Sequence, residues 1–565
     1  MSKIIIVKPE KCVGCNACVR NCPAPEANIT KEISEGKFVT TVNDAKCIAC
    51  GECVKTCSHG ARDYIDDTKE AMEQVGKQKM IVIVAPAIKT VLRDKWKSIL
   101  NWFKERNCDV YDVSFGADIC TWGHIRTIEQ NRMGNIISQP CAAIVKYIEL
   151  YQPDLIKNLS PIHSPMLCTA IYIRKYMQRS EKIIALSPCV AKKNEFDETR
   201  FVNYNVTFKK LMEYFDANGI NIQLDFGNDF QYDFAHIQGQ YGGIYPRIGG
   251  LRDNIWLHNP TVPITTSEGV HKVYPELNMY AKLSTIEQPP VFDVLSCEHG
   301  CNVGAGTGNE KTIFSIMKDM RAIEKDAENR RKVSGGWFGR GGTDKLFKDF
   351  DKELRLEDFI RGYQAVGSSF VPTRDELEPI YARMGKVTDA DKHYDCKACG
   401  YSSCKEMATA IYRGLNVPMN CIMHAKASIA AEHKKAVQDK EAYKQKLISF
   451  VSKISDVQTL LNELNLINNL NTDATGEANL ATKTAKKLSE SITQIIDSAN
   501  AENFTNEAIT QLKQSFEKVS TAFGEFSEYI STSSKNSLDT SDKIKSAKTS
   551  IADIQKALND LVAEE

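Results

Sequence analysis

Cysteine is the residue that most constrains what this chain can fold into. The 565 residues include 19 cysteines, and sixteen of them fall into four groups of four. Grouped thiolates are ligands for metals, and a chain of this length needs more than one core. The sequence therefore predicts several modules, most of them built around a metal centre. Three cysteines are left over: Cys108, Cys120 and Cys168.

Composition sets the expected compartment and excludes some partners. No apolar run approaches the ~20 residues of a spanning helix, and the apolar stretch near Met1 is too short for a signal peptide. We therefore expect a cytoplasmic protein with no membrane partner, in which thiols stay reduced. The 72 basic and 72 acidic side chains balance. This balance gives no electrostatic case for binding nucleic acid.

The first two groups are Cys-x2-Cys-x2-Cys-x3-Cys runs at residues 12–22 and 47–57. This is the spacing of a two-cluster bacterial ferredoxin, in which the fourth cysteine of each run ligates the other cluster. Two zinc ribbons are the alternative. We expect a ferredoxin-like α+β domain over 1–70 that conducts electrons. Its two 4Fe-4S clusters would be held by an outer set, Cys12, Cys15, Cys18 and Cys57, and an inner set, Cys47, Cys50, Cys53 and Cys22.

The third group is spread over three loops. Cys297 and Cys301 follow a predicted buried strand at 291–295, and ligands collect where the strands of an α/β sheet end. Alone, this Cys-x3-Cys pair fits structural cysteines or a zinc site. Two Pro-Cys loops strengthen the case for a shared cluster, at Cys141 and at Cys189. Glycines behind the pair let the backbone approach a ligand closely: Gly304 and Gly306.

Together these loops resemble the three signature loops of iron-only (FeFe) hydrogenases, over about 78–365. Segments 85–87 and 115–118 also fall where that family has similar segments. In the family, four cysteines hold a 4Fe-4S cluster that is bridged to a two-iron site carrying CO, cyanide and a dithiolate, together called the H-cluster. The resemblance implies that Cys301 is the bridge. It implies a core set of ligands: Cys141, Cys189, Cys297 and Cys301.

The resemblance also assigns residues around the two-iron site. Lys192 matches the family lysine that contacts a cyanide, although an ordinary surface lysine is the alternative for any single position. Hydrogen and protons are the implied substrates. The other residues that the resemblance places at the catalytic pocket or against the cofactor are Ala85, Pro86, Pro140, Pro188, Ser187, Gly304 and Gly306.

The chain departs from the catalytic pattern of the family at the proton path. Catalytic members have a proton-passing thiol where this chain has Pro140, which has no labile proton. The family's acidic pair falls near Gly123 and His124, and a relay serine survives as Ser160 or Ser164. Two pocket methionines are replaced, by Ser187 and Leu295. These losses predict slow turnover and resemble the sensory hydrogenases.

Leftover side chains offer a substitute proton route. The candidates are Cys120, Cys168 and His124, of which Cys120 is the strongest because it lies two residues after Asp118. Cys168 fits a core position better. A working, ferredoxin-linked hydrogenase whose coiled coil only oligomerises it stays open beside the slow one. A further alternative is a non-catalytic hydrogenase-like iron-sulfur protein.

Alternating strand and helix patterns predict a two-lobed α/β core over 78–365. The strand patterns lie at 80–84, 110–113 and 183–186, and residues 89–106 predict one amphipathic helix. Residues 366–392 are typical of a linker. A small single-cluster 4Fe-4S module is predicted over 393–425, with a helix at 405–413, and zinc as the alternative metal. Its ligands form a module set: Cys396, Cys399, Cys404 and Cys421.

Residues 426–565 predict long helices that form a coiled coil. No proline follows Pro418, and apolar residues recur at heptad spacing. A lone amphipathic helix would expose its stripe, so we expect a homodimer, acting as a stalk or as a signalling coiled coil. A ferredoxin or a signalling kinase or phosphatase is the expected redox or output partner. The blocks are Val451, Ile454, Val457, Leu461 and Leu464; Leu512, Phe516, Val519, Phe523, Phe526 and Ile530; and Ile544, Ala547, Ile551, Ile554, Leu558 and Leu561.

Overall fold

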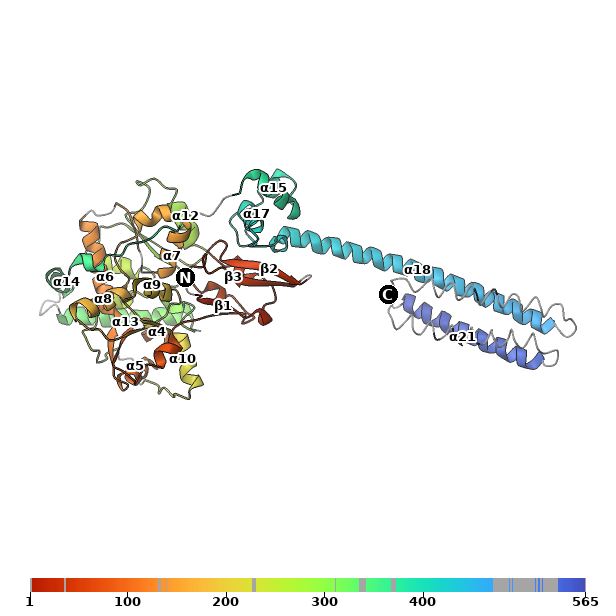
Figure 1. Ribbon diagram of the computed structural model, residues 1–565, viewed down its shortest axis with the longest axis horizontal. Coiled ribbons are helices and arrows are strands. Elements are labelled where there is room, and N and C mark those ends of the chain that lie inside the picture. The colour runs from red at the N-terminus through yellow and green to blue at the C-terminus, as the bar shows by residue number, and fades with distance from the viewer. Residues whose placement is uncertain are drawn as a thin grey trace. The chain divides into compact units, whose positions relative to one another are not determined.

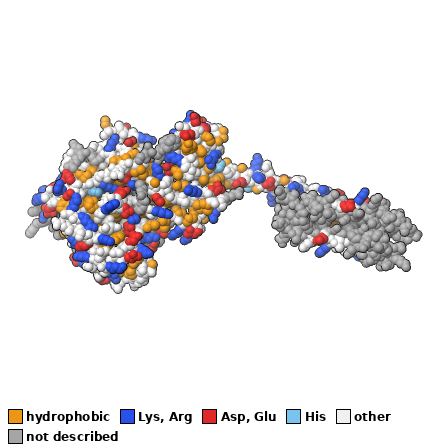
Figure 2. Space-filling view, in the orientation of Figure 1, with side chains coloured by type: hydrophobic (Ala, Val, Ile, Leu, Met, Phe, Trp, Pro, Cys, Tyr) orange, Lys and Arg blue, Asp and Glu red, His pale blue; other side chains and the backbone are white. Residues whose placement is uncertain are grey.

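The computed structural model divides into two compact units, Met1–Ala425 and Lys426–Glu565 (Figure 1). It describes residues 3–34, 37–130, 134–138, 140–225, 230–309, 311–334, 342–366, 372–470 and 537–563, with single positions between 487 and 521. Figure 2 shows basic and acidic side chains interspersed on the visible face of the first unit. No helix among the described residues is long and apolar enough to cross a membrane.

The first lobe is a four-stranded parallel sheet in the order β6-β5-β8-β9. β5 (Met80–Val84) is buried along its whole length, and so is β8 (Ile183–Ser187). Parallel strands rich in isoleucine and valine are covered on both faces. The predicted strands at 80–84 and 183–186 are confirmed. The edge strands of this sheet are β6 (Cys108–Asp112) and β9 (Tyr204–Thr207).

Residues 88–104 form two helices where the sequence predicts one. α4 (Ile88–Val91) ends at Val91, and residues 92–95 separate it from α5 (Trp96–Lys104). The Asp225 carboxylate accepts hydrogen bonds from the backbone N–H groups of Lys97 and Ser98, at 2.7 and 2.9 Å, and so caps α5. A capping partner about 130 residues away cannot be found by local periodicity. The predicted apolar side is nevertheless buried: Val91, Trp96, Ile99, Leu100 and Phe103.

The second lobe is a three-stranded parallel sheet in the order β10-β11-β7. β11 (Val291–Leu295) has the bounds that the sequence predicts and is buried throughout. It lies between β10 (Ile264–Glu268) and the short β7 (Ile136–Ile137). The strand directions bring the loops after β7 and β11 to one edge of the sheet. Helices α7 (Ala142–Tyr151) and α12 (Val273–Tyr280) pack in the same lobe.

The N-terminal residues form two antiparallel pairs. β1 (Ile5–Val7) pairs with β4 (Arg62–Tyr64), and β2 (Asn28–Ser34) pairs with β3 (Lys37–Val42). Two one-turn helices carry cysteines of the first two runs. These two helices are α1 (Ala17–Arg20) and α2 (Glu52–Lys55). The other α-helices described up to residue 360 are α3 (Thr68–Met72), α6 (Val113–Glu129), α8 (Pro165–Ile171), α9 (Lys192–Thr199), α10 (Phe208–Ala217), α11 (Gly250–Trp256), α13 (Ile313–Ser334) and α14 (Gly342–Glu353).

Residues 374–392, which the sequence analysis assigns to a linker, are helical. α15 (Arg374–Arg383) begins with a capping box between Thr373 and Glu376, and α16 (Asp389–Lys392) follows it. α15 packs against α17 (Cys404–Tyr412), close to the helix predicted at 405–413. The two prolines of this region suggested a linker, but its apolar residues have helical spacing. They are buried: Leu377, Ile380, Tyr381 and Met384.

The second unit contains parts of two long helices, α18 (Ile422–Leu470) and α21 (Ser537–Ala563). Their apolar residues form one cluster, so the two helices bury each other's stripes within a single chain. The predicted block at 512–530 lies outside the described residues, apart from single positions. The buried members of the other two blocks are Ile454, Val457, Leu461, Leu464, Ile544, Ala547, Ile551, Ile554 and Leu558.

Candidate metal centre

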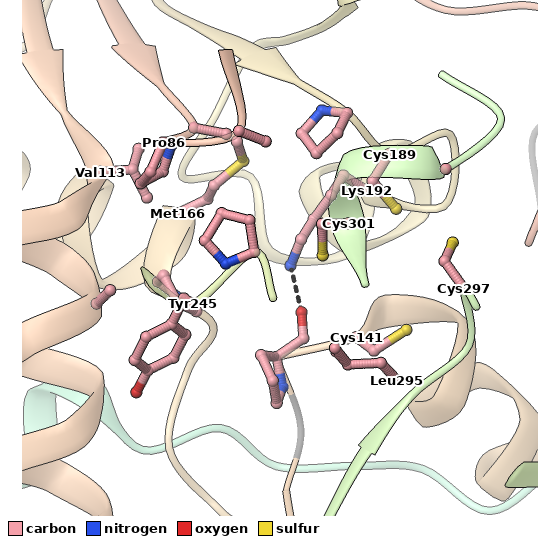
Figure 3. Close-up of a pocket in the computed structure, with 18 of the residues that line it drawn as sticks. Pro86, Val113, Cys141, Met166, Cys189, Lys192, Tyr245, Leu295, Cys297 and Cys301 are labelled. Atoms are coloured by element: carbon pink, nitrogen blue, oxygen red, sulfur yellow. Dashed lines mark hydrogen bonds between the residues drawn. The ribbon is translucent and has the colours of Figure 1, made fainter. Parts of the chain in front are cut away.

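A cavity of about 100 Å³ lies where loops from both sheets converge. Its walls come from the loops after β5, β8 and β11 and from the segment between β7 and α7 (Figure 3). In parallel sheets these are the carboxyl ends of strands, where ligands bind. The lining is mostly apolar, with Val113 and Met166 beside Ala85, Pro86 and Ala87. Such a cavity keeps water away from whatever it encloses.

All four thiols of the core set line this cavity. Burial raises the pKa of Cys301 to about 12, and the neighbouring Cys141 and Cys189 add to the rise because thiolates repel one another. Burial and Cys141 likewise raise the pKa of Cys189 to about 11. Four thiols whose charges oppose each other fit a polynuclear cationic group, which relieves both the desolvation and the repulsion.

The core set supplies four thiols, a donor set that both structural zinc and 4Fe-4S clusters take. Among the described residues, no three His, Cys, Asp or Glu side chains are close enough to share one metal ion.

Lys192 stands at the first turn of α9 and reaches into the cavity (Figure 3). Its ammonium donates to the carbonyl oxygen of Pro140 at 3.2 Å and pairs with Glu195. Glu195 is fully buried and also accepts from Ser164 at 3.0 Å and from Arg361 at 3.3 Å. The lysine is 7% exposed, so it is not an ordinary surface residue. Of the two candidate relay serines, Ser164 is the one that contacts this network.

The other predicted pocket residues differ in how they serve the site. Pro140 and Pro188 line the cavity, and Pro140 offers it no donor. Ser187 is buried and bonds Asn205 at 2.6 Å and the Cys189 backbone N–H at 3.2 Å, so it holds the loop rather than lining the cavity. A Cβ on Gly306 would lie 2.8 Å from the Pro188 carbonyl oxygen, so this glycine permits close packing of two loops.

The leftover candidates Cys120, Cys168 and His124 lie together in the interior. The Cys120 sulfur is 3.7 Å from His124 Nδ1, which also contacts the Cys120 carbonyl oxygen at 2.8 Å. Although burial disfavours the thiolate, hydrogen bonds from Cys168 and His124 lower the pKa of Cys120 to about 5. The Nε2 atom of His124 is buried with no partner. These residues do not line the cavity.

Tyr245 connects this polar group to the cavity, and the sequence analysis did not identify it. Its ring lines the cavity, and its hydroxyl lies 2.8 Å from the hydroxyl of Thr121. It comes from the segment around Gly242, where a Cβ would lie 2.1 Å from the Ser114 carbonyl oxygen. The paired glycines before Tyr245 are the sequence signal that this segment packs closely against another part of the backbone. The sequence does not show that this part is α6.

The inner set and the module set each surround a small cavity of their own. The four inner cysteines line one between α2 and the β2–β3 pair. The four module cysteines line another, with Asp395 and Lys386 beside them. In the outer set, Cys18 accepts from Arg62 at 3.2 Å and contacts Thr40 at 3.3 Å, while Cys15 is exposed. The structure therefore brings together the cysteines that spacing assigned to the inner and module sets.

Three segments of the chain match known protein families. Residues 78–258 match the family model for the iron-only hydrogenase large subunit, C-terminal domain. Residues 11–61 match a 4Fe-4S dicluster domain, and residues 393–423 match an Fe-S cluster family. With its core set in a cavity between two parallel sheets, the protein is a hydrogenase-like iron-sulfur protein. Residues 78–258 are thus similar to the C-terminal domain of FeFe hydrogenases.

Individual hydrogenases are also similar to parts of this chain. The periplasmic Fe hydrogenase large subunit of Nitratidesulfovibrio vulgaris is 29% identical over 210 residues, which is 33% of this chain and 49% of the relative. The chain thus spans about half the length of that relative. Two solved structures of the FeFe-hydrogenase HydA1 from Chlamydomonas reinhardtii align over 54% of this chain and 100% of theirs, with TM-scores of 0.42 and 0.41 at 14% and 13% identity.

Proposed function

We propose that this protein is a sensory-type FeFe hydrogenase of the cytoplasm. It binds hydrogen at an H-cluster held by the core set, and it oxidises or produces hydrogen slowly. The outer, inner and module sets would each hold a further 4Fe-4S cluster, and these clusters would supply electron transfer toward the C-terminal helices. One observation supports this most: the core set and the buried Lys192 share an apolar cavity in which Pro140 replaces a proton-passing thiol.

Each residue of the cavity has a distinct task in this proposal. The H-cluster, when bound, supplies the chemistry that splits or forms hydrogen. Cys301 is the proposed bridging ligand, and the Lys192 ammonium faces the cavity as a fixed positive charge that suits a cyanide ligand. The Pro140 carbonyl and the Glu195 carboxylate orient this ammonium. The apolar wall of Ala85, Pro86, Val113 and Met166 excludes water.

The proposed slow turnover follows from the lack of a proton donor at Pro140. A positioned acid–base group typically contributes about 10²–10⁴-fold to a rate. The Pro140 ring has no labile proton, and the Lys192 ammonium beside it is held in an ion pair with Glu195. Protons therefore reach the cavity without a dedicated donor at this position. A site that binds hydrogen well and turns it over slowly suits detection better than bulk conversion.

A second candidate function is an ordinary catalytic hydrogenase whose C-terminal helices only oligomerise it. The observation in its favour is the buried group of Cys120, His124 and Cys168, joined to the cavity by Tyr245. This group would have to replace the missing thiol. The Tyr245 hydroxyl points away from the cavity, toward the side of Thr121 (Figure 3). The sensory proposal is therefore the better supported one.

Infrared spectroscopy of the matured protein tests the proposal. CO and cyanide bands are expected, together with about 18 irons per chain from four cubanes and two further irons. Steady hydrogen turnover should be well below that of catalytic FeFe hydrogenases assayed alongside. Absence of the bands with full cubane content would make this a non-catalytic iron-sulfur protein. Turnover equal to the catalytic enzymes would favour the second candidate.

The proposed output runs through residues 426–565. We expect a homodimer that responds to a ferredoxin, or that engages a kinase or phosphatase. α18 begins at Ile422, directly after the module ligand Cys421, which puts the start of the helix at the cluster. Hydrogen exchange of residues 422–470 should differ between hydrogen-reduced and oxidised protein. Identical exchange in both states, or a monomer by light scattering, would reduce this region to a structural element.

A further inference from the structure

Six charged side chains form an ion-pair network that begins at the cavity of the core set. Cations and carboxylates alternate along it, and neighbouring members are 2.5–3.3 Å apart. Five members are less than a tenth exposed, whereas the Glu198 side chain is 40% exposed and reaches solvent. Buried charges of this kind are stable only where each has its partners. The members, in order from the cavity, are Lys192, Glu195, Arg361, Glu198, Lys146 and Glu149.

The network joins the two helices that follow ligand loops of the core set. α7 begins directly after Cys141, and α9 begins three residues after Cys189. α7 contributes two members and packs in the second lobe, while α9 contributes three and buries Phe196 in the first. The sixth member, Arg361, follows the 3-10 helix at 356–359. The network therefore spans both lobes beside the core site, and Arg361 enters it from a third segment of the chain.

The backbone of Arg361 is itself held in place. Its N–H donates to the Pro161 carbonyl oxygen at 2.6 Å, and the nearby Phe359 carbonyl oxygen accepts from the His163 N–H at 2.9 Å. These bonds tie it to the segment that leads into the cavity wall at Pro165. A guanidinium is planar, always charged and able to bind two carboxylates at once. Arg361 is therefore a fixed anchor rather than a mobile surface cation.

Glu195 shares its two carboxylate oxygens between two cations. One oxygen accepts from Lys192 at 2.5 Å and from Ser164 at 3.0 Å, and the other faces the Arg361 guanidinium at 3.3 Å. The Lys192 ammonium in turn divides its bonds between this carboxylate and the Pro140 carbonyl oxygen at the cavity, 3.2 Å away (Figure 3). A buried carboxylate attracts a given cation more strongly when it has fewer other partners. The attraction that draws Lys192 away from the cavity therefore depends on Arg361.

We propose that Arg361 is a positioning residue of the core site: by sharing Glu195 with Lys192, it sets how far the lysine ammonium reaches into the cavity. Arg361 is itself divided between Glu195 at 3.3 Å and the partly exposed Glu198 at 2.9 Å, so Glu198 tunes the effect from the surface. Arg361 does not line the cavity and acts on it only through Glu195. The inference rests on the proposed function, because the cyanide ligand that Lys192 faces provides its readout.

Two substitutions should move the Lys192 ammonium in opposite directions. Arg361→Met removes one of the two cations at Glu195, so this carboxylate draws the ammonium away from the cavity. Glu198→Gln frees Arg361 to bind Glu195 more tightly, so the ammonium is released toward the cavity. The infrared bands of cyanide respond to the distance of a nearby charge. In the matured protein these bands should therefore shift to one side in the first variant and to the other side in the second.

Two further variants serve as rescue and control, Arg361→Lys and Arg179→Met. The lysine keeps a cation beside Glu195 and should return the cyanide bands most of the way to their positions in the unaltered protein. Arg179 is a matched control in the first lobe, because it also binds two carboxylates, Asp109 at 2.7 Å and Glu181 at 2.5 Å, and is not a member of the network. Arg179→Met should leave every band in place. The comparison separates the loss of any buried ion pair from the loss of this anchor.

Two results would overturn the inference. One is cyanide bands that stay in place in both Arg361→Met and Glu198→Gln, even where less cofactor is bound, because the network then only holds the lobes together. The other is a shift in the same direction in both variants. If Arg361→Met takes up no cofactor, the band shift of Glu198→Gln decides alone, since that side chain is at the surface. If the unaltered protein has no CO or cyanide bands, the proposed function fails, and crystal structures of the cubane-loaded variants decide the inference. They should show the contact of Lys192 with the Pro140 oxygen lost in Arg361→Met and kept in the Arg179 control.

Discussion

The core site and the small module hold the same kind of ligand set but are built in opposite ways. The module gathers its four thiols from 26 consecutive residues, 396–421. The core site gathers four from three segments spread over 161 residues, 141–301, at the strand ends of two different sheets. A locally built site depends on its own turns. A site built between lobes depends on everything that positions the lobes.

The largest expected effect comes from removing one thiol in each site. Cys301→Ala should abolish the CO and cyanide infrared bands completely, because the two-iron site loses its proposed bridge. Cys421→Ala should remove one cubane and leave those bands in place. Iron content and infrared spectra of both variants check this. Bands that survive in Cys301→Ala would show that another residue is the bridge.

The next largest effect should be on the rate of hydrogen turnover rather than on cofactor binding. Pro140→Cys places a thiol where the family passes protons, and it keeps the backbone carbonyl that Lys192 binds. Hydrogen turnover should rise by up to about 10²-fold, the lower end of what a positioned proton donor contributes. Activity per H-cluster, with infrared bands as the measure of loading, checks this. Pro188→Ala is the control, since it changes a neighbouring loop proline and adds a backbone N–H but no thiol.

A substitution in the first lobe, away from the thiols, should affect the core site and leave the small module unchanged. Lys89 and Asp112 form a buried ion pair at 2.9 Å, and Lys89 follows the cavity segment 85–87. Lys89→Met leaves the Asp112 carboxylate unpaired, which should destabilise the lobe by about 3–5 kcal/mol. The core site should lose cofactor while the module cubane stays. Urea unfolding and iron spectra measure both effects.

The same ion pair gives a pH dependence. Burial by itself would raise the pKa of Asp112, but the Lys89 ammonium and the Gln238 amide lower it to about 2. The unfolded value is about 4. Because the folded pKa is the lower one, the stabilisation is present above pH ~4 and is lost as the pH falls toward 2. Lys89→Met should therefore flatten the acid limb of the stability curve.

The smallest effect on either metal site should come from the helical unit. Leu461 is fully buried between α18 and α21. Leu461→Ala should destabilise this unit by about 2–5 kcal/mol, because it leaves a cavity. Ile448→Ala is the matched control, since Ile448 lies on the same helix and is 46% exposed. Circular dichroism should report the loss of helix, with infrared bands and cubane spectra unchanged.

Several local features of this protein were predicted from sequence patterns. Strand β11, the helix after Cys404 and the grouping of the inner and module cysteines all follow from short-range spacing. The break between α4 and α5 was not predicted, because Asp225 caps α5 from far along the chain. The role of Tyr245 was not predicted for the same reason, since only the fold brings its loop to α6. The helices at 374–392 were not predicted, because the two prolines were given more weight than the apolar pattern of helical spacing.

The pairing of β5 with β8 has a consequence for the order of assembly. Ile81 and Ile183 are neighbours in the sheet but lie roughly a hundred residues apart in sequence, and contacts of such separation form slowly. The outer and inner cysteines lie within residues 12–57, so they leave the ribosome first and can come together much earlier. During synthesis the chain therefore carries these short-range thiol groups first. The cavity of the core set closes later, after both lobes have left the ribosome.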